Sequence, residues 1–205
     1  MPTRRTFLAL AFATCAMLSA PATVRAAVDD PGRFVTTMAQ QAIQTAASPG
    51  LSRDARLDRF RTLFVAAFDM NELGQAVLGP YWRQASPVQQ KQFLDLFREL
   101  QVLTWAGRFQ DYSAVDLTVL GVGQSPDGTV AVESVIARGA GGPPIPVLWR
   151  LNKSAEGFKV VDIVVEGVSM AITERKVYFS AMQSLGGKID GLLDIMRRKI
   201  EQLKA

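Results

Sequence analysis

Apolar residues recur at helical spacing through the first half of the chain. Aromatic and aliphatic side chains stand three or four positions apart, which is the period of one helix face. Residues that favour helix starts and stops, among them Ser52, Asp69 and Gly79, lie between these stretches. Ser86 and Gln89 also form a capping-box pattern. The spacing predicts four helices, over about 31–47, 52–68, 69–79 and 87–110.

The second half of the chain changes to a period of two residues. Apolar side chains alternate from Ile145 to Leu151, which is typical of a strand with one buried face. Turn signals such as Pro126-Asp127-Gly128 are short, and short connections favour antiparallel pairing. The pattern predicts strands beginning at 115 and over 129–138, 145–151 and 158–166, then helices over 168–183 and 188–203. The expected fold is one α+β domain, with helices packed on a curved antiparallel sheet of about four strands.

The strand predicted at 158–166 is apolar on both faces. Val161, Ile163 and Val165 alternate along one face, and only Asp162 and Glu166 interrupt the apolar character of the other. A strand of this kind is covered on both sides. Helices and loops could cover both faces, or one face could line a cavity that holds an apolar ligand.

The candidate cavity wall comes from the last two predicted strands. If the apolar faces point inward, the wall residues are Val147, Trp149, Val161, Ile163 and Val165. A shift of one residue in the pairing would bring the other face inward, and core packing remains the alternative role for Trp149. Trp82, beside Arg83 at a helix junction, is either an aromatic plug between helices or part of the cavity mouth.

The first 26 residues are typical of a secretory signal peptide. Arg4 and Arg5 precede an apolar run from Leu8 to Ala20, and Ala26 ends a segment suited to cleavage. The run is shorter than the roughly 20 apolar residues that a membrane-spanning helix needs. The paired arginines also fit a twin-arginine signal, so both export routes stay open. We therefore expect residues 1–26 to be removed and residues 27–205 to form the mature domain.

Composition excludes several kinds of site from the mature chain. The sequence has no histidine, and its single cysteine, Cys15, lies in the predicted signal peptide. A histidine base, a cysteine nucleophile, a disulfide and a Cys/His metal site are therefore excluded, and no cofactor is expected. Loss of Arg4, Arg5 and Arg25 lowers the formal net charge from +4 to +1. A charge this small removes the main support for nucleic-acid binding.

An ordered set of short motifs resembles one known family. The motifs run from Leu78 to Pro87, through Phe97-Arg98 and Thr104-Trp105-Ala106, to Asp162 and the segment from Glu166 to Met170. This set is similar to that of the MlaC family of periplasmic phospholipid carriers, also called the toluene-tolerance family, over about residues 34–193. The resemblance implies a periplasmic, non-enzymatic lipid carrier. It also implies two partners, an inner-membrane ABC-type transporter complex and an outer-membrane lipoprotein complex.

The resemblance leaves the lipid and the docking surface open. Trp105 replaces a more usual tyrosine, and Tyr178 stands where many members have phenylalanine. Relatives associated with hopanoids vary in this region, so a hopanoid is an alternative cargo. Arg175 stands where the family commonly has an arginine, and Arg197 and Arg198 lie nearby on the last predicted helix. These three are the candidate docking residues, although a solvated basic face explains them equally well.

An enzyme and a protein-binding adaptor are the alternatives from other classes. A cone-shaped α+β fold can run acid–base chemistry on an apolar substrate with carboxylates alone. Glu133, Asp162 and Glu166 are the strand carboxylates available for such a role. A buried carboxylate without a partner is costly, so a structural hydrogen bond is the competing role for Asp162.

Overall fold

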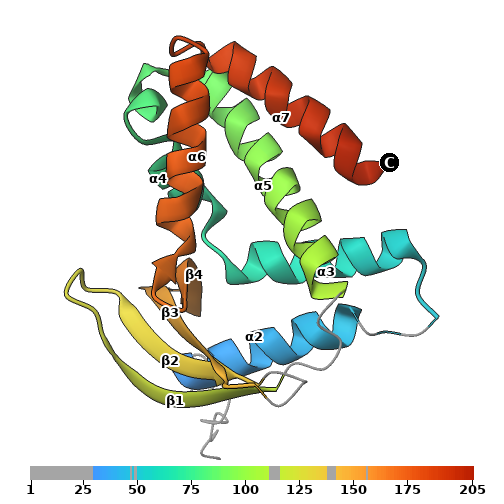
Figure 1. Ribbon diagram of the computed structural model, residues 1–205, viewed down its shortest axis with the longest axis vertical. Helices are drawn as coiled ribbons and strands as arrows, with labels where there is room; N and C mark the ends of the chain where they lie inside the picture. The colour runs from blue at the N-terminus through green and yellow to red at the C-terminus, as the bar shows by residue number, and fades with distance from the viewer. Residues whose placement is uncertain (1–29, 47, 49, 111–115, 138–141, 156) are drawn as a thin grey trace, which may run out of the picture.

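The computed structural model describes residues 30–46, 48, 50–110, 116–137, 142–155 and 157–205 (Figure 1). In chain order these residues form α2 (Pro31–Ala46), α3 (Arg53–Ala67), α4 (Met70–Leu78), the 3-10 helix η1 (Gly79–Gln84), α5 (Pro87–Gln110), β1 (Leu117–Gln124), β2 (Val130–Ile136), β3 (Ile145–Ser154), β4 (Gly157–Val165), β5 (Val168–Ser169), α6 (Met170–Ser184) and α7 (Ile189–Lys204). The signal peptide predicted for residues 1–26 lies outside the described residues, as do Val115 and Arg138 at predicted strand ends. Within the described residues, no helix has the length and apolar character needed to cross a membrane.

The helix boundaries follow from the capping residues that the sequence places there. The side chains of Ser52 and Asp69 each accept a hydrogen bond from the backbone N–H three residues later, at 3.2 and 2.9 Å. Ser86 and Gln89 exchange the two bonds of a capping box, at 3.2 and 3.0 Å. Gly79 ends α4 with a φ of 58°, a conformation that few other residues adopt readily. These starts and stops confirm the predicted helices of the first half.

The link between the predicted helices 69–79 and 87–110 is itself helical. Residues 79–84 form the 3-10 helix η1, with Pro80 in its first turn and the Ala85 backbone N–H bonded to the carbonyls of Tyr81 and Trp82. Proline fits the first turn because that position lacks an intrahelical partner for its N–H in any case. The chain therefore reverses tightly between α4 and α5.

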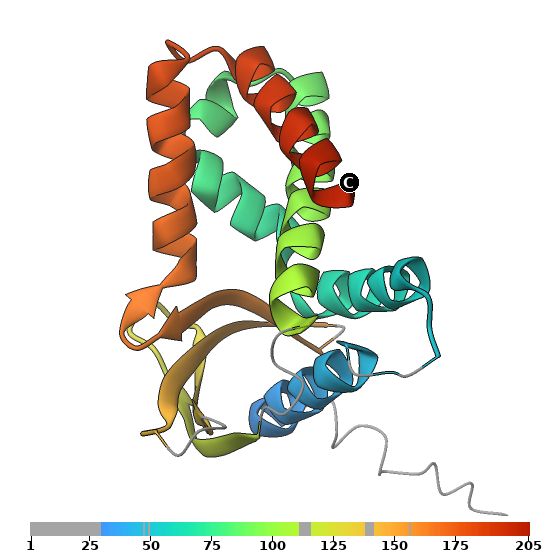
Figure 2. The ribbon, with the colours of Figure 1, turned by 45° about the vertical axis from the view of Figure 1, so that its right-hand side comes forward.

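The strands form one antiparallel sheet in the order β1-β2-β3-β4-β5. The sheet is strongly curved, and α2 lies along its inner face (Figure 2). Val35 of α2 is fully buried there with Val132 and Val160 of the sheet. The fifth strand, β5, was predicted as the start of a helix. Glu166 and Gly167, with φ of 49° and 83°, form a tight turn that pairs β5 with β4 before α6 begins.

A β-bulge in β4 changes which side chains face inward. Arg150 on β3 pairs with Asp162, but the next residue, Leu151, pairs with Val160, so Val161 has no partner across the strands. An extra residue reverses the alternation of side chains on either side of it. Val160 and Ile163 therefore both join the core of the sheet, and Val161 does not.

Two clusters of buried residues hold the fold together. One lies between the sheet and α2, and the other lies among helices α3 to α7 (Figure 1). Phe68, at the end of α3, packs against both clusters. The Asp69 backbone N–H also bonds to the Val160 carbonyl at 3.0 Å, which attaches the start of α4 to β4. These contacts join the two layers into the single α+β domain that was predicted.

The helical cluster contains a polar group with no partner among the described residues. The Tyr178 hydroxyl is buried and makes no hydrogen bond to a described residue, while its ring packs edge-on against Phe93 and Phe97 at 5.7 and 5.9 Å. Burial, with a smaller effect of the Glu174 carboxylate, raises the pKa of the Tyr178 phenol. An unsatisfied buried polar group destabilises a fold.

We expect Tyr178→Phe to raise the free energy of unfolding by about 1 kcal/mol, because it removes this unsatisfied group without changing the ring. The difference in free energy of unfolding between the variant and the wild type should increase above pH about 10. The wild-type phenol can ionise there in the unfolded state but not in the folded one. Denaturant titrations of both proteins at neutral and alkaline pH measure this. Equal or lower stability for the phenylalanine variant would show that the hydroxyl has a partner in solution.

Candidate functional site

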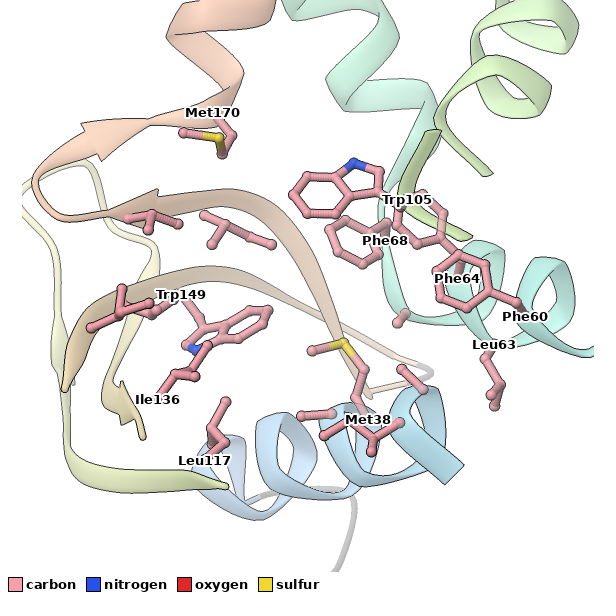
Figure 3. Close-up of a pocket in the computed structure, with 18 residues that line it drawn as sticks. Met38, Phe60, Leu63, Phe64, Phe68, Trp105, Leu117, Ile136, Trp149 and Met170 are labelled. Atoms are coloured by element: carbon pink, nitrogen blue, oxygen red, sulfur yellow. The ribbon is translucent and has the colours of Figure 1, made fainter. Parts of the chain in front are cut away.

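A cavity of about 330 Å³ lies between the inner face of the sheet and helices α2, α3 and α5 (Figure 3). Its volume falls at the lower end of the range of about 300–1,000 Å³ that is usual for ligand pockets. The wall consists of apolar residues: Met38, Ala39, Ala42, Ile43, Phe60, Leu63, Phe64, Ala67, Phe68, Trp105, Leu117, Ile136, Ile145, Val147, Trp149, Ile163, Val165 and Met170. No wall residue carries a formal charge, so the cavity suits hydrocarbon.

Four of the six residues proposed from the sequence line this cavity: Val147, Trp149, Ile163 and Val165. The pairing of β3 with β4 brings them together, since Val147 stands directly opposite Val165 and Trp149 opposite Ile163. Directly opposed side chains on one face of a sheet contact each other. The alternation seen in the sequence of β3 thus builds one wall of the cavity.

The other two proposed residues do not line the cavity. Val161 is the bulged residue of β4, so the regular alternation assumed from the sequence assigns it to the wrong face. Trp82 lies in η1, where it packs against the helical cluster and its carbonyl accepts a hydrogen bond from Gln90 Nε2 at 2.9 Å. The structure therefore favours the plug between helices over the cavity mouth for Trp82.

Several wall residues were not proposed from the sequence, and the largest group comes from α3. Phe60, Phe64 and Phe68 stack in succession, with ring centroids 5.6 and 4.2 Å apart, and all three line the cavity (Figure 3). Met38 on α2 and Trp105 on α5 complete the side opposite the sheet. Their helical spacing was visible in the sequence, but spacing shows that a helix face is buried and not what it is buried against.

The polar atoms of Trp149 are satisfied within the wall. Its indole Nε1–H donates to the buried Ser134 hydroxyl at 2.9 Å, and that hydroxyl donates to the Val147 carbonyl at 3.1 Å. The indole ring can therefore face the cavity as an apolar surface while its N–H is bonded behind it. A ligand in this part of the cavity meets carbon rather than a free donor.

The three strand carboxylates considered for catalysis lie outside the cavity wall. Asp162 accepts hydrogen bonds from the Ser169 hydroxyl at 2.6 Å and from the Ala171 backbone N–H at 2.9 Å. These bonds hold the start of α6 against β4, which is the structural role anticipated for Asp162. Glu133 is exposed on β2, and Glu166 is exposed in the turn between β4 and β5.

The candidate docking arginines are exposed on two different helices. Arg175 lies on α6 with its guanidinium over Gly79, close enough that a Cβ at that glycine would be 3.6 Å from its nitrogens. Arg197 lies on α7 and pairs with Asp194 at 2.6 Å, and the neighbouring Arg198 is exposed. Their positions are compatible with docking, and they remain a prediction.

The fold and the site define an α+β protein built around an internal apolar cavity. The chain belongs to the MlaC family, whose model, described as MlaC protein, matches residues 35–198. This match confirms the resemblance noted in the sequence.

Two known proteins illustrate the relationship. The chain is 25% identical over 114 residues to the toluene tolerance protein ttg2D of Pseudomonas putida, a match covering 56% of this chain and 53% of that protein. The chain thus spans about half the length of this curated relative. A solved structure of a phospholipid-binding protein from Ralstonia solanacearum, in complex with a phospholipid, is similar with a TM-score of 0.72. That similarity has 25% sequence identity and covers 86% of this chain and 99% of the other.

Proposed function

We propose that this protein binds a phospholipid, or a closely related lipid, with its acyl chains in the apolar cavity. The observation that carries the proposal is a wall built entirely from apolar side chains, in a fold similar to that of a phospholipid-bound protein. Each buried CH₂ contributes about 0.8 kcal/mol, so one long acyl chain contributes on the order of 10 kcal/mol when it leaves water. Binding of such a ligand therefore depends on burial of its acyl chains far more than on polar contacts.

We further propose that the protein is a periplasmic carrier rather than an enzyme. Family membership supports a role between an inner-membrane ABC-type transporter complex and an outer-membrane lipoprotein complex. The positions of Glu133, Asp162 and Glu166 outside the wall offer no support for carboxylate chemistry on a substrate in the cavity. ATP hydrolysis would belong to the transporter, because this sequence has no G-x-x-x-x-G-K-[ST] motif.

Lipid extraction from vesicles tests the proposed function. Delipidated protein would be mixed with vesicles of labelled phosphatidylethanolamine, separated from them by size, and assayed for bound label. We expect close to one lipid per protein. A parallel sample with vesicles that also contain a hopanoid identifies the preferred cargo. Protein that emerges without either lipid would contradict the proposal.

We predict that charge on α7 affects transfer to a partner more than lipid binding. Reversing Arg197 and Arg198 to glutamate should leave the lipid content unchanged, because both side chains are exposed and neither lines the cavity. Transfer to the partner complex should slow, most clearly at low salt, since charge complementarity mainly sets the rate and orientation of encounter. Lipid content and transfer rate would be measured on one preparation, and lipid loss with unchanged transfer would overturn this division of roles.

A further inference from the structure

A second pocket, of about 210 Å³, adjoins the apolar cavity between α3, α5 and the end of α7. Phe60 lines both spaces, so the two pockets meet at this residue. The second pocket differs in character because Arg53 and Arg56 line it, together with apolar residues such as Leu57 and Leu103. Cationic groups therefore stand beside a cavity whose own wall has none.

One face of α3 connects the two pockets. Arg53, Arg56, Phe60 and Phe64 are spaced by three or four residues, so they share a helix face that changes from cationic to aromatic. Arg56 precedes Ala67 by eleven residues, which corresponds to about 16 Å along a helix axis. The acyl layer of one membrane leaflet is about 15 Å thick, half of the hydrocarbon core. Arg56 thus stands about one acyl-chain length from the far end of this cavity-lining face, and Arg53 stands one turn further away.

The positive charge in this pocket is not neutralised within the described part of the chain. Among the described residues, Arg56 Nε is buried and makes no hydrogen bond, and Arg53 donates only to the Leu203 carbonyl, at 3.3 Å. Elsewhere on α3, Arg61 forms ion pairs with Asp58 and Glu99. No ion pair among the described residues involves Arg53 or Arg56.

Within the described residues, two other arginines also have a buried Nε without a partner, but both are ion-paired. Arg98 pairs with Asp95 and Arg150 with Asp127, so their charges are compensated through other nitrogens. Arg56 has no such compensation among the described residues. The Nε is shielded even from water, so an anion in the pocket would meet the terminal nitrogens of Arg56, for which no hydrogen bond is found among the described residues.

We propose that Arg53 and Arg56 bind the phosphate-type anionic headgroup of the lipid whose chain occupies the cavity. This inference rests on the proposed function and adds a preference for a negatively charged polar end. Guanidinium groups suit phosphate because they offer several donors in a planar fork. Phe60 would lie at the boundary, with hydrocarbon on one side and the headgroup on the other.

A pair of amphiphiles with the same palmitoyl chain tests the headgroup separately from the chain. Palmitoyl lysophosphatidic acid carries a phosphate, and monopalmitoylglycerol is neutral. Dissociation constants for both would be measured with the wild type, Arg56→Gln and Arg59→Gln. Arg59 provides a matched control, because it is exposed on the same helix and lines neither pocket. Inorganic phosphate alone serves as the probe for an ion site that is independent of the chain.

We expect Arg56→Gln to weaken binding of the lysophosphatidic acid about tenfold, which is the usual effect of losing a hydrogen bond to a charged group. Binding of the neutral amphiphile should be unchanged, and Arg59→Gln should affect neither. Arg53→Gln, the second variant, should act in the same direction, and circular dichroism would verify its fold and that of Arg56→Gln.

The outcomes separate this inference from the proposed function. If Arg56→Gln weakens binding of both amphiphiles equally, or of neither, the headgroup site would be overturned. The proposal of a lipid cavity would remain intact. Tight binding of inorganic phosphate, without any acyl chain, would also overturn the headgroup site, since the pocket would then be an independent ion site. If the wild type binds neither amphiphile, the proposed function itself fails.

Discussion

Ile163→Glu should lower the amount of bound lipid at least tenfold. Ile163 is buried in β4, lines the cavity and stands opposite Trp149, so a carboxylate there would face the acyl chains directly. Burying an unpaired carboxylate against hydrocarbon costs several kcal/mol, which is enough to outweigh much of the binding energy of one chain. Bound phospholipid would be measured in organic extracts of the purified variant.

Val161→Glu provides the matched control for this experiment. Val161 lies two residues away on the same strand but belongs to the bulge and lines no part of the cavity. We expect this variant to keep its lipid, and circular dichroism would show whether each variant is folded. A folded Ile163→Glu protein with its full lipid content would contradict the assignment of the cavity wall, as would selective loss of lipid from Val161→Glu.

Asp162→Ala should lower the free energy of unfolding by about 3 kcal/mol. The carboxylate accepts one hydrogen bond from the Ser169 hydroxyl and one from the Ala171 backbone N–H, both at the start of α6. Removing it leaves two polar groups without this partner, and losing a hydrogen bond to a charged group costs about 1.5–3 kcal/mol. Denaturant unfolding measures the loss, and stability like that of the wild type would contradict the role.

Two further variants separate the contributions at this junction. Asp162→Asn retains an oxygen acceptor for the Ala171 N–H, so we expect a smaller loss than with alanine. Ser169→Ala removes both the donor to Asp162 and the N-cap of α6, which accepts from the Ile172 N–H at 3.1 Å, and should cost about 2–3 kcal/mol. If Asp162→Asn unfolds like the wild type but loses turnover of an apolar substrate, Asp162 would have a catalytic role instead.

The wall contributed by β3 could be predicted because local alternation decides which side chains face inward. Val147 and Trp149 belong to a regular strand, and both line the cavity. The bulge in β4 was not predictable in the same way. It depends on how Leu151 and Val160 pair across two strands, and such pairing leaves no period in the sequence of either strand. The alternation rule consequently placed Ile163 correctly and Val161 incorrectly.

The helical side of the cavity shows a second limit of sequence patterns. Phe60, Phe64 and Phe68 gave a clear helix signal, and Ser52 gave the correct start. A stripe of phenylalanines looks the same whether it packs on protein or faces a ligand, because both environments remove it from water. Only the position of α3 relative to the sheet distinguishes the two cases.

Native mass spectrometry of the gently purified mature protein tests the central claim most directly. We predict a dominant species whose added mass equals one lipid molecule, and release of a phospholipid or hopanoid on collisional activation. The Ile163→Glu protein, prepared in parallel, should appear mainly at the mass of the bare chain. A wild-type protein that appears only at the bare mass, and stays so after incubation with phospholipid vesicles, would contradict the account.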